Sequence, residues 1–245
     1  MILLKIKAVT PVVVPPKECR RREEGTKRDA GLRPNTEIRF VSIRNGPRYL
    51  LYFSELLSSD YNVMLEASKA EKEGYDAVQP DCTFDPAVKV LKELLNIPVV
   101  GPLECSVHIA SMLGRKFSIL VNDIKMAKFY EERVREYGLA DKLASIRESS
   151  ITLEDLGIHS GKQDVETIKK KISVAGEKAI LEDDADVIIL PCTDIFGLKD
   201  LFMEKYGVPV LEPGPIATKM AETLFDLGLK QSKKAYPSPL SELKL

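Results

Sequence analysis

Two cysteines occupy matching places in this 245-residue chain. Cys82 lies in "YDAVQPDCTFDP" and Cys192 in "DVIILPCTDI", and in each stretch an apolar run ends just before a Cys-Thr pair. An aspartate, Asp76 or Asp186, stands six positions before each cysteine. Thiols have an ordinary pKa of about 8.5, which neighbours can tune toward neutrality, so two thiols flanking one carbon can remove and return a proton. The pattern favours a racemase or epimerase with Cys82 and Cys192 as its two bases.

The two cysteine stretches belong to a longer internal repeat. The offset is 110 positions between Cys82 and Cys192, and 111 between Pro98 and Pro209, so one residue is inserted in the second copy. Each copy has the pattern of a strand, a Cys-Thr turn, a helix, a second strand and a second helix, over about thirty-five residues. Because ligands of parallel sheets bind at the carboxyl ends of the strands, we expect both cysteines to face one cleft.

Short apolar runs alternate with helical patterns along most of the chain, which is typical of βαβ units. Together with the repeat, this alternation predicts an α/β fold of two pseudosymmetric lobes. Each lobe is expected to hold a parallel sheet of the flavodoxin-like or Rossmann-like kind, flanked by helices, with the active site in the cleft between them. The strands are predicted at 3–9, 37–43, 76–80, 98–101, 117–122, 145–149, 186–191 and 208–212, and the helices at 48–73, 86–95, 104–113, 124–137, 164–183, 198–205 and 215–228.

Charge and hydropathy narrow the classes of partner. The formal net charge is −1, from 36 basic and 37 acidic side chains, which gives no reason to expect nucleic acid or an acidic membrane surface. The basic cluster at 17–28 is interleaved with acids, so we predict a solvated loop there. No run of 18 apolar residues exists, and the first residues have the pattern of a strand rather than of a signal peptide. We therefore expect a small-molecule substrate and no membrane partner.

The number and spacing of the cysteines argue against a disulfide scaffold or a metal site. The chain has four cysteines, and none of them forms a CxxC pair. With only His108 and His159 available, no zinc-ligand spacing is present, so no metal is expected. Sparse cysteines favour a reducing compartment, and we predict a cytoplasmic location. Cys19 and Cys105 have no partner in the repeat, so core or surface placement is expected for both.

The residues beside the two cysteines have a structural and a functional interpretation. A lone cysteine after a strand is more often core than catalyst, and Thr83 and Thr193 could simply close turns. A hydroxyl and free N–H groups beside a helix start also form an anion cradle, and the same helix start favours thiolate. Asp81 and Asp194 could each orient or tune a thiol, or cap a helix. The repetition of the Cys-Thr pair favours the functional interpretation.

These stretches resemble the aspartate/glutamate/hydantoin racemase superfamily. The resemblance is carried by "DCTFDP" at 81–86, "IPVVGPLECSVHIASMLGRKFSILV" at 97–121, "DVIILPCTDI" at 186–195 and "GVPVLEPGPIA" at 207–217. The Cys-x-x-Asp-Pro string and "GP" at 46–47 are most similar to the hydantoin racemase branch. One departure is "VTPVVVPP" after the first strand, where that branch carries an Asn-Pro-Asn-Thr type turn.

The resemblance implies a racemase of the isomerase class that works without a cofactor. It implies Cys82 and Cys192 as the catalytic pair, with Thr83, Thr193, Asp85 and Pro47 binding the substrate. A C-terminal helix that returns to the first lobe is also implied, and we predict one lobe of 1–103 plus 217–245 and another of 104–216. A homo-oligomer is expected.

Several alternatives stay open at this point. The substrate is a small molecule with a carbonyl-activated stereocentre, of the hydantoin, allantoin or amino-acid type. Decarboxylation or cis–trans isomerisation is a related possibility that the superfamily also contains, although one cysteine suffices there. A non-catalytic protein that binds a small anion is the alternative outside enzymes, since a fold does not imply a function.

Overall fold

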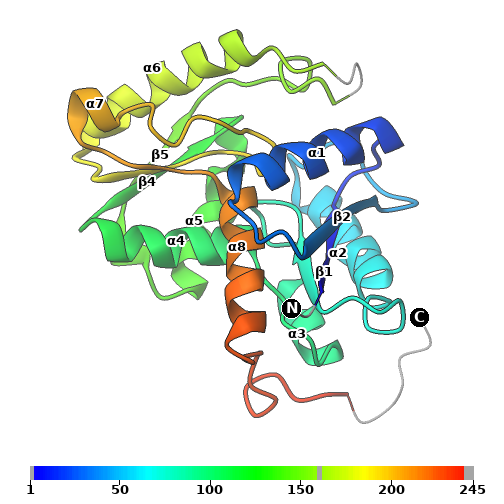
Figure 1. Cartoon of the computed structure of the whole chain (residues 1–245). Helices are drawn as coiled ribbons and strands as arrows, with labels where there is room; N and C mark the ends of the chain where they lie inside the picture. The colour runs from blue at the N-terminus through cyan, green and yellow to red at the C-terminus, as the bar shows by residue number, and fades with distance from the viewer. Residues whose placement is uncertain (1–2, 159–161, 240–245) are drawn as a thin grey trace.

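The computed structural model describes residues 3–158 and 162–239, and its strands form two parallel sheets, one in each half of the molecule (Figure 1). The first sheet has the order β2-β1-β3, and the second has the order β5-β4-β6-β7. Each sheet has an early strand of its half, β1 or β4, in an inner position. The strands are β1 (Leu4–Thr10), β2 (Thr36–Ser42), β3 (Ala77–Pro80), β4 (Phe117–Val121), β5 (Leu143–Glu148), β6 (Val187–Ile189) and β7 (Val210–Leu211). The two-lobed α/β prediction is confirmed.

Helices pack on both sheets. In the first half, α1 and α8 pack against each other and against the sheet, while α2 and α3 form a second pair. In the second half, α6 lies above β4 and β5 in Figure 1, and α4 and α5 lie below. The helices are α1 (Pro16–Asp29), α2 (Phe53–Ala67), α3 (Val88–Leu94), α4 (Pro102–Leu113), α5 (Ala127–Glu136), α6 (Val165–Asp183), α7 (Met203–Tyr206) and α8 (Pro213–Asp226), with short 3₁₀ turns η1 (Ile124–Met126) and η2 (Ala140–Lys142).

The internal repeat is visible in the register of the strands. In the first half, Val78 forms an isolated parallel bridge with Val99. In the second half, Ile188 of β6 pairs with Val210 of β7. These partners are displaced by 110 positions from 78 to 188 and by 111 from 99 to 210, the same offsets as in the sequence. The duplicated strand, turn and second strand therefore adopt the same pairing twice.

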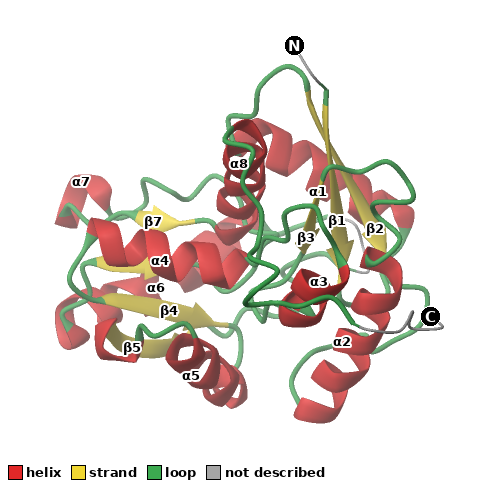
Figure 2. Ribbon diagram, turned by 90° about the horizontal axis from the view of Figure 1, so that it is seen from below, coloured by secondary structure: helices red, strands yellow, loops and turns green. Residues whose placement is uncertain are grey.

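The second helix of the repeat also has the same form in both copies. Both α4 and α8 begin with a proline at the first turn, Pro102 and Pro213, where a missing N–H costs nothing. The two helices pack against each other, and α8 also packs on β1 and β3 (Figure 2). The last helix of the chain is thereby in contact with the first sheet. The division of the chain at 103/104 and 216/217 stays a prediction.

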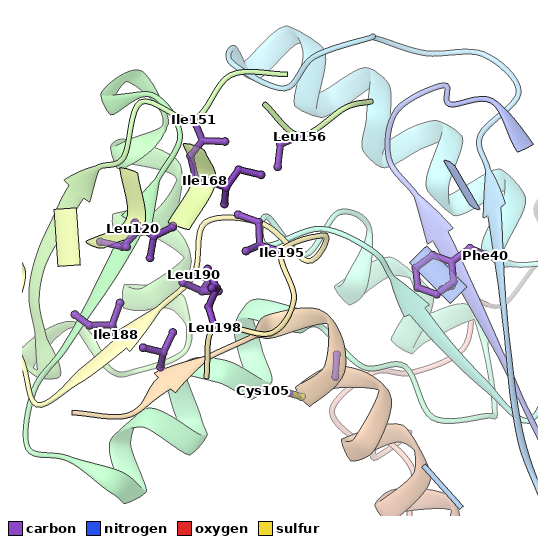
Figure 3. Packing of buried hydrophobic residues seen from close by; sticks show 14 of the residues in the cluster. Phe40, Cys105, Leu120, Ile151, Leu156, Ile168, Ile188, Leu190, Ile195 and Leu198 are labelled. Carbon is purple, nitrogen blue, oxygen red and sulfur yellow. The ribbon is translucent and has the colours of Figure 1, made fainter. Parts of the chain in front are cut away.

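One buried apolar cluster extends through both halves. It includes Ile6 of β1, Phe40 of β2 and Leu120 of β4. In Figure 3, Leu120, Ile188 and Leu190 gather beside the second sheet, while Phe40 lies across the picture in the first half. Because these residues share one core, the two sheets are joined by packing as well as by the chain. None of the helices in the described ranges is long and apolar enough to cross a membrane.

The prediction of a solvated loop at 17–28 is wrong, because this segment is helix α1. Pro16 at its first turn presets helical backbone geometry. Its buried positions include Cys19, Arg22 and Thr26, which recur at helical spacing. The periodicity was hidden because two of the five buried residues, Glu18 and Arg22, are charged. Charged residues are almost never fully buried unless they are paired.

Three predicted helices are shorter than the sequence pattern suggested. The helix at 48–73 covers only Phe53–Ala67, and the helix at 86–95 begins at Val88. Of the helix predicted at 198–205, only one turn forms, α7, because the backbone groups of Leu198 and Lys199 make hydrogen bonds outside a helix. The Leu198 N–H donates to the Glu212 carboxylate and the Lys199 carbonyl accepts from Val210 N.

Glu222 links α8 to the first half and gives a prediction about stability. Its carboxylate accepts hydrogen bonds from the Arg33 N–H at 2.9 Å, the Thr36 hydroxyl at 2.5 Å and the Lys219 ammonium. Burial alone would raise its pKa, but these donors lower the pKa of Glu222 from 4.5 to about 2.

We predict that Glu222→Gln lowers the free energy of unfolding at pH 7. A lowered pKa stabilises the fold at pH values above the ordinary pKa, and that contribution is lost as the pH falls from about 4.5 toward 2. Urea unfolding of wild type and variant between pH 7 and pH 3 should show the gap closing below about pH 4.5. Glu204→Gln on exposed α7 is the control. A gap that does not depend on pH would contradict this account.

Candidate active site

A cavity of about 430 Å³ lies at the carboxyl ends of β3 and β6. Both cysteine turns line it, so the structure brings Cys82, Thr83, Cys192 and Thr193 into one site. The cysteines are half-buried and the threonines are buried. Carboxyl ends of parallel strands are where open α/β sheets bind ligands, because side chains and free N–H groups of the following turns converge there.

The two turns hold each other through a reciprocal pair of hydrogen bonds. The Thr83 hydroxyl donates to the carbonyl of Pro191, just before Cys192, at 3.1 Å. The Thr193 hydroxyl donates to the carbonyl of Asp81, just before Cys82, at 3.3 Å. Each turn is thus fixed by the threonine of the other lobe, and the pairing repeats the offset of 110 positions.

The threonine hydroxyls are therefore engaged within the protein. Thr83 also shares a 2.5 Å hydrogen bond with the phenol of Tyr130. The backbone N–H groups of Thr83, Cys192 and Thr193 donate to no protein acceptor within 3–158 and 162–239. Backbone N–H groups of this kind are the donors that a carbonyl or an enolate oxygen requires. They are the remaining part of the expected anion cradle.

Both thiols are protonated at neutral pH in the unliganded protein. Burial raises the pKa of Cys82 far above its ordinary value, and the nearby Cys192 thiol adds to the shift, while the Phe84 N–H opposes it. Burial raises the pKa of Cys192 to about 12, with Asp194 acting in the same direction and Arg22 and the Asp194 N–H opposing it. In each turn the N–H two residues after the cysteine points to the sulfur, so the thiol surroundings are matched at the backbone.

A buried ionic network lies beside the two turns. The Arg22 guanidinium donates to the Asp81 carboxylate at 2.7 Å and lies 3.3 Å from the Asp194 carboxylate. Arg21 donates to Asp194 at 2.5 and 2.7 Å, and both arginines also bind Glu18. Arg22 itself lines the cavity. One arginine therefore connects the acid before Cys82 to the acid that follows Thr193.

The carboxylates and guanidiniums of this network shift each other's pKa. Burial alone would lower the pKa of Arg22, but Asp194 and Asp81 raise it well above its ordinary value. Burial raises the pKa of Asp194 to about 6, against the two arginines. Arg21, Arg22 and Glu18 were not anticipated as site residues, because α1 was not predicted. The sequence signal was the recurrence of Cys19, Arg22 and Thr26 behind a proline.

Two of the residues that were expected to bind substrate lie elsewhere. Asp85 does not line the cavity, and its carboxylate accepts from Leu103 N at 2.9 Å and Glu104 N at 2.7 Å, which caps α4. Burial raises the pKa of Asp85 to about 6, while Tyr137 and these two N–H groups oppose the shift. Pro47 is half-buried and also outside the lining, although its neighbour Arg48 belongs to it. Asp85 is expected to act through the fold.

The rest of the lining is mainly apolar, with a few polar groups. Arg48 is exposed at the cavity and has no ion-pair or hydrogen-bond partner in the described part of the chain. Asn122 follows β4 and also lacks one there. The apolar part of the wall consists of Pro11, Val12, Leu50, Leu51, Phe84, Met126, Ile151, Leu153, Leu156, Ile158 and Pro191.

The remaining cysteines and histidines stand apart from the cavity. Cys19 and Cys105 are free, buried thiols, in α1 and α4 respectively. His108 is exposed on α4, and His159 lies outside the described residues. Within the described ranges, no three His, Cys, Asp or Glu side chains are grouped to hold a metal ion.

The chain is similar to known racemases along most of its length. The sequence model of the Asp/Glu/Hydantoin racemase family matches residues 23–221. A hydantoin racemase of Pseudomonas sp. (strain NS671) is 34% identical over 209 residues, 84% of this chain and 82% of that protein. A hydantoin racemase of Paenarthrobacter aurescens is 33% identical and spans 76% and 78%. The crystal structure of an allantoin racemase from Pseudomonas fluorescens superposes with a TM-score of 0.87 at 28% identity, covering 99% and 100% of the two chains.

The ionic network leads to a prediction about stability. Arg22→Met should lower the free energy of unfolding by about 3–5 kcal/mol, because it leaves Asp81 and part of Asp194 as uncompensated buried charge. Arg22→Lys should lower it less, since an ammonium keeps the charge but cannot form the same fork. Arg20→Met, on the exposed side of the same helix, is the matched control. Chemical denaturation at pH 7 measures all three, and equal stability of Arg22→Met and Arg20→Met would rule out the proposed role of the network.

Proposed function

We propose that the two cavity cysteines of this chain exchange protons with a stereocentre of the hydantoin or allantoin kind. The chain belongs to the Asp/Glu/hydantoin racemase family and is an isomerase of the racemase type. The observation that carries the proposal is that Cys82 and Cys192 line one cavity on turns locked together by Thr83 and Thr193. The proposal requires no cofactor, because thiols supply both the base and the acid.

The chemistry divides one inversion into two proton movements. One cysteine, as thiolate, takes the proton from the carbon beside the substrate carbonyl, and the electron pair left on carbon delocalises onto the carbonyl oxygen. The other cysteine, as thiol, then gives its proton to the opposite face of the planar carbon. The free N–H groups of Thr83, Cys192 and Thr193 stabilise the negative charge on oxygen, which is usually a large part of catalysis. The opposite enantiomer uses the two cysteines in exchanged roles.

Several finer statements form part of the proposal. Asp85 would support the site by capping α4, and Pro47 by placing the adjacent Arg48 at the cavity. We propose a homo-oligomer, which sedimentation velocity would test, and a cytoplasmic location, where the two thiols stay reduced. A decarboxylase or a non-catalytic anion-binding protein are the alternatives, and exchange of the substrate's C–H with D₂O separates a racemase from a binding protein.

The division of roles predicts the behaviour of single variants. Cys82→Ser and Cys192→Ser should each abolish racemisation, because a hydroxyl is too weak an acid and base at neutral pH. Each variant should still exchange the α-proton of one enantiomer with D₂O through its remaining cysteine, and that enantiomer should differ between the two variants. NMR of both enantiomers of a 5-substituted hydantoin in D₂O measures this exchange.

Two controls accompany this experiment. Cys19→Ser and Cys105→Ser should racemise near the wild-type rate, because neither thiol lines the cavity. Normal racemisation by both Cys82→Ser and Cys192→Ser would show that the two cavity cysteines are not the bases.

The raised pKa of the thiols predicts the pH dependence. Burial raises the pKa of Cys192 to about 12, so near pH 7 only a small fraction of molecules carries a thiolate. Since this fraction grows about tenfold per pH unit below the pKa, kcat/KM should rise with a slope near one from about pH 6.5 to 9. Polarimetry measures the rate, with the Cys82→Ser/Cys192→Ser double variant subtracted as the uncatalysed reaction. A plateau below about pH 8 would contradict a thiolate base with a raised pKa.

A further inference from the structure

Asn122 is a polar cavity residue whose side chain has no hydrogen-bond partner among the described residues. It stands directly after β4, an inner strand of the second sheet, and it lines the same cavity as Cys82 and Cys192. Its Oδ1 atom is buried and accepts no hydrogen bond within 3–158 and 162–239, and its Nδ2 group donates none there. A buried polar atom without a partner destabilises a fold, so a side chain of this kind at a cavity indicates an interaction with a ligand.

The carboxamide restricts which ligand fits. It presents an N–H donor and a C=O acceptor side by side, and rotation about its last side-chain bond turns this edge without disturbing the backbone. Its complement is a group with an acceptor and a donor side by side. The cis-amide of a five-membered ring has this arrangement, because the ring holds its N–H and C=O on one edge. A carboxylate has two acceptors, so one of its oxygens would face the Oδ1 atom.

The surroundings of Asn122 fit this assignment. Apolar side chains such as Met126 and Ile151 line the same cavity, together with the acids Asp123 and Glu148, and the apolar part of the wall strengthens a hydrogen bond beside it. The backbone N–H groups of Thr83, Cys192 and Thr193 remain available for the carbonyl beside the reacting carbon. One substrate can then use both sets of groups if it carries a carbonyl next to its stereocentre and a cis-amide edge in the same ring.

We propose that Asn122 binds the cis-amide edge of a cyclic ureide or imide through two hydrogen bonds, and so selects ring substrates over free amino acids. This deepens the proposed function and rests on it for the identity of the cavity as the substrate site. Asn122 is a specificity residue in this proposal, and the proton transfers remain with the cysteines.

Binding of a ligand that cannot react tests the proposal apart from catalysis. The probe is 5,5-dimethylhydantoin, which has no hydrogen at the reacting carbon, with its N1-methyl and N3-methyl analogues. Isothermal titration calorimetry on the full chain should show that methylation of one ring nitrogen weakens binding to the wild type by about tenfold or more. Asn122→Leu should bind the parent compound about tenfold more weakly and should no longer discriminate against that analogue.

The Asn122→Asp variant tests whether one hydrogen bond to the ligand is enough or both are needed. The carboxylate has the size of the carboxamide and accepts from an N–H, but it offers no donor to the ring carbonyl, so Asn122→Asp should also bind weakly. The thermal midpoint of Asn122→Leu should equal or exceed that of the wild type, because the substitution removes no hydrogen bond within the described protein.

The outcomes divide clearly. Equal discrimination by wild type and Asn122→Leu, wild-type affinity in Asn122→Asp, or no binding of 5,5-dimethylhydantoin by the wild type would each overturn the assignment of Asn122. Binding with the expected discrimination, together with no exchange of any 5-substituted hydantoin in D₂O, would support the assignment and contradict the proposed racemisation.

Discussion

The geometry of the cavity depends on the exchange of hydrogen bonds between the two cysteine turns. The hydroxyls of Thr83 and Thr193 reach across to the carbonyls of Pro191 and Asp81, so neither turn can shift without loss of a buried hydrogen bond. Groups that transfer protons to one carbon must be placed within a fraction of an ångström. The hydrogen bonds between the two turns provide this placement, whereas turns without them would leave each thiol free to move.

Repulsion between two thiolates suits the proposed reaction, which needs one base and one acid. Each thiol has a pKa far above neutrality, and a charge on Cys192 raises the pKa of Cys82. A second thiolate is therefore strongly disfavoured, and a site that loses one proton holds one thiolate and one thiol. The acids Asp81, Asp194 and Glu18 outnumber the arginines that bind them, so the nearby field also opposes a thiolate. The backbone N–H groups of Phe84 and Asp194 act in the opposite direction, since they lower the pKa of Cys82 and of Cys192 respectively.

The sequence was sufficient to predict what depends on local apolar periodicity and on the repeat. Both sheets and their parallel direction follow from strands that are buried on both faces. Most helices follow from apolar residues at helical spacing. Helix α1 could not be predicted in this way, because its buried face includes Arg22, whose partners Asp81 and Asp194 lie 59 and about 170 positions away along the chain. The resemblance implied that Asp85 binds substrate, whereas in the structure its carboxylate accepts hydrogen bonds from the first turn of α4. Contacts distant in sequence leave no local pattern.

The two turns match in their backbone and differ in one side chain. Phe84 and Asp194 occupy the same place two residues after each cysteine, and both N–H groups point to the neighbouring sulfur. Asp194 carries a carboxylate that Arg21 and Arg22 bind, whereas the Phe84 side chain has no charge. The electric fields at the two thiols therefore differ. Enantiomers have the same free energy in water, so a racemase with one stereocentre must have equal kcat/KM in both directions. The unequal fields can therefore make kcat differ between the enantiomers only if KM differs by the same factor. Their physical consequence concerns the few molecules that have lost one proton, in which the thiol with the lower pKa carries the thiolate more often.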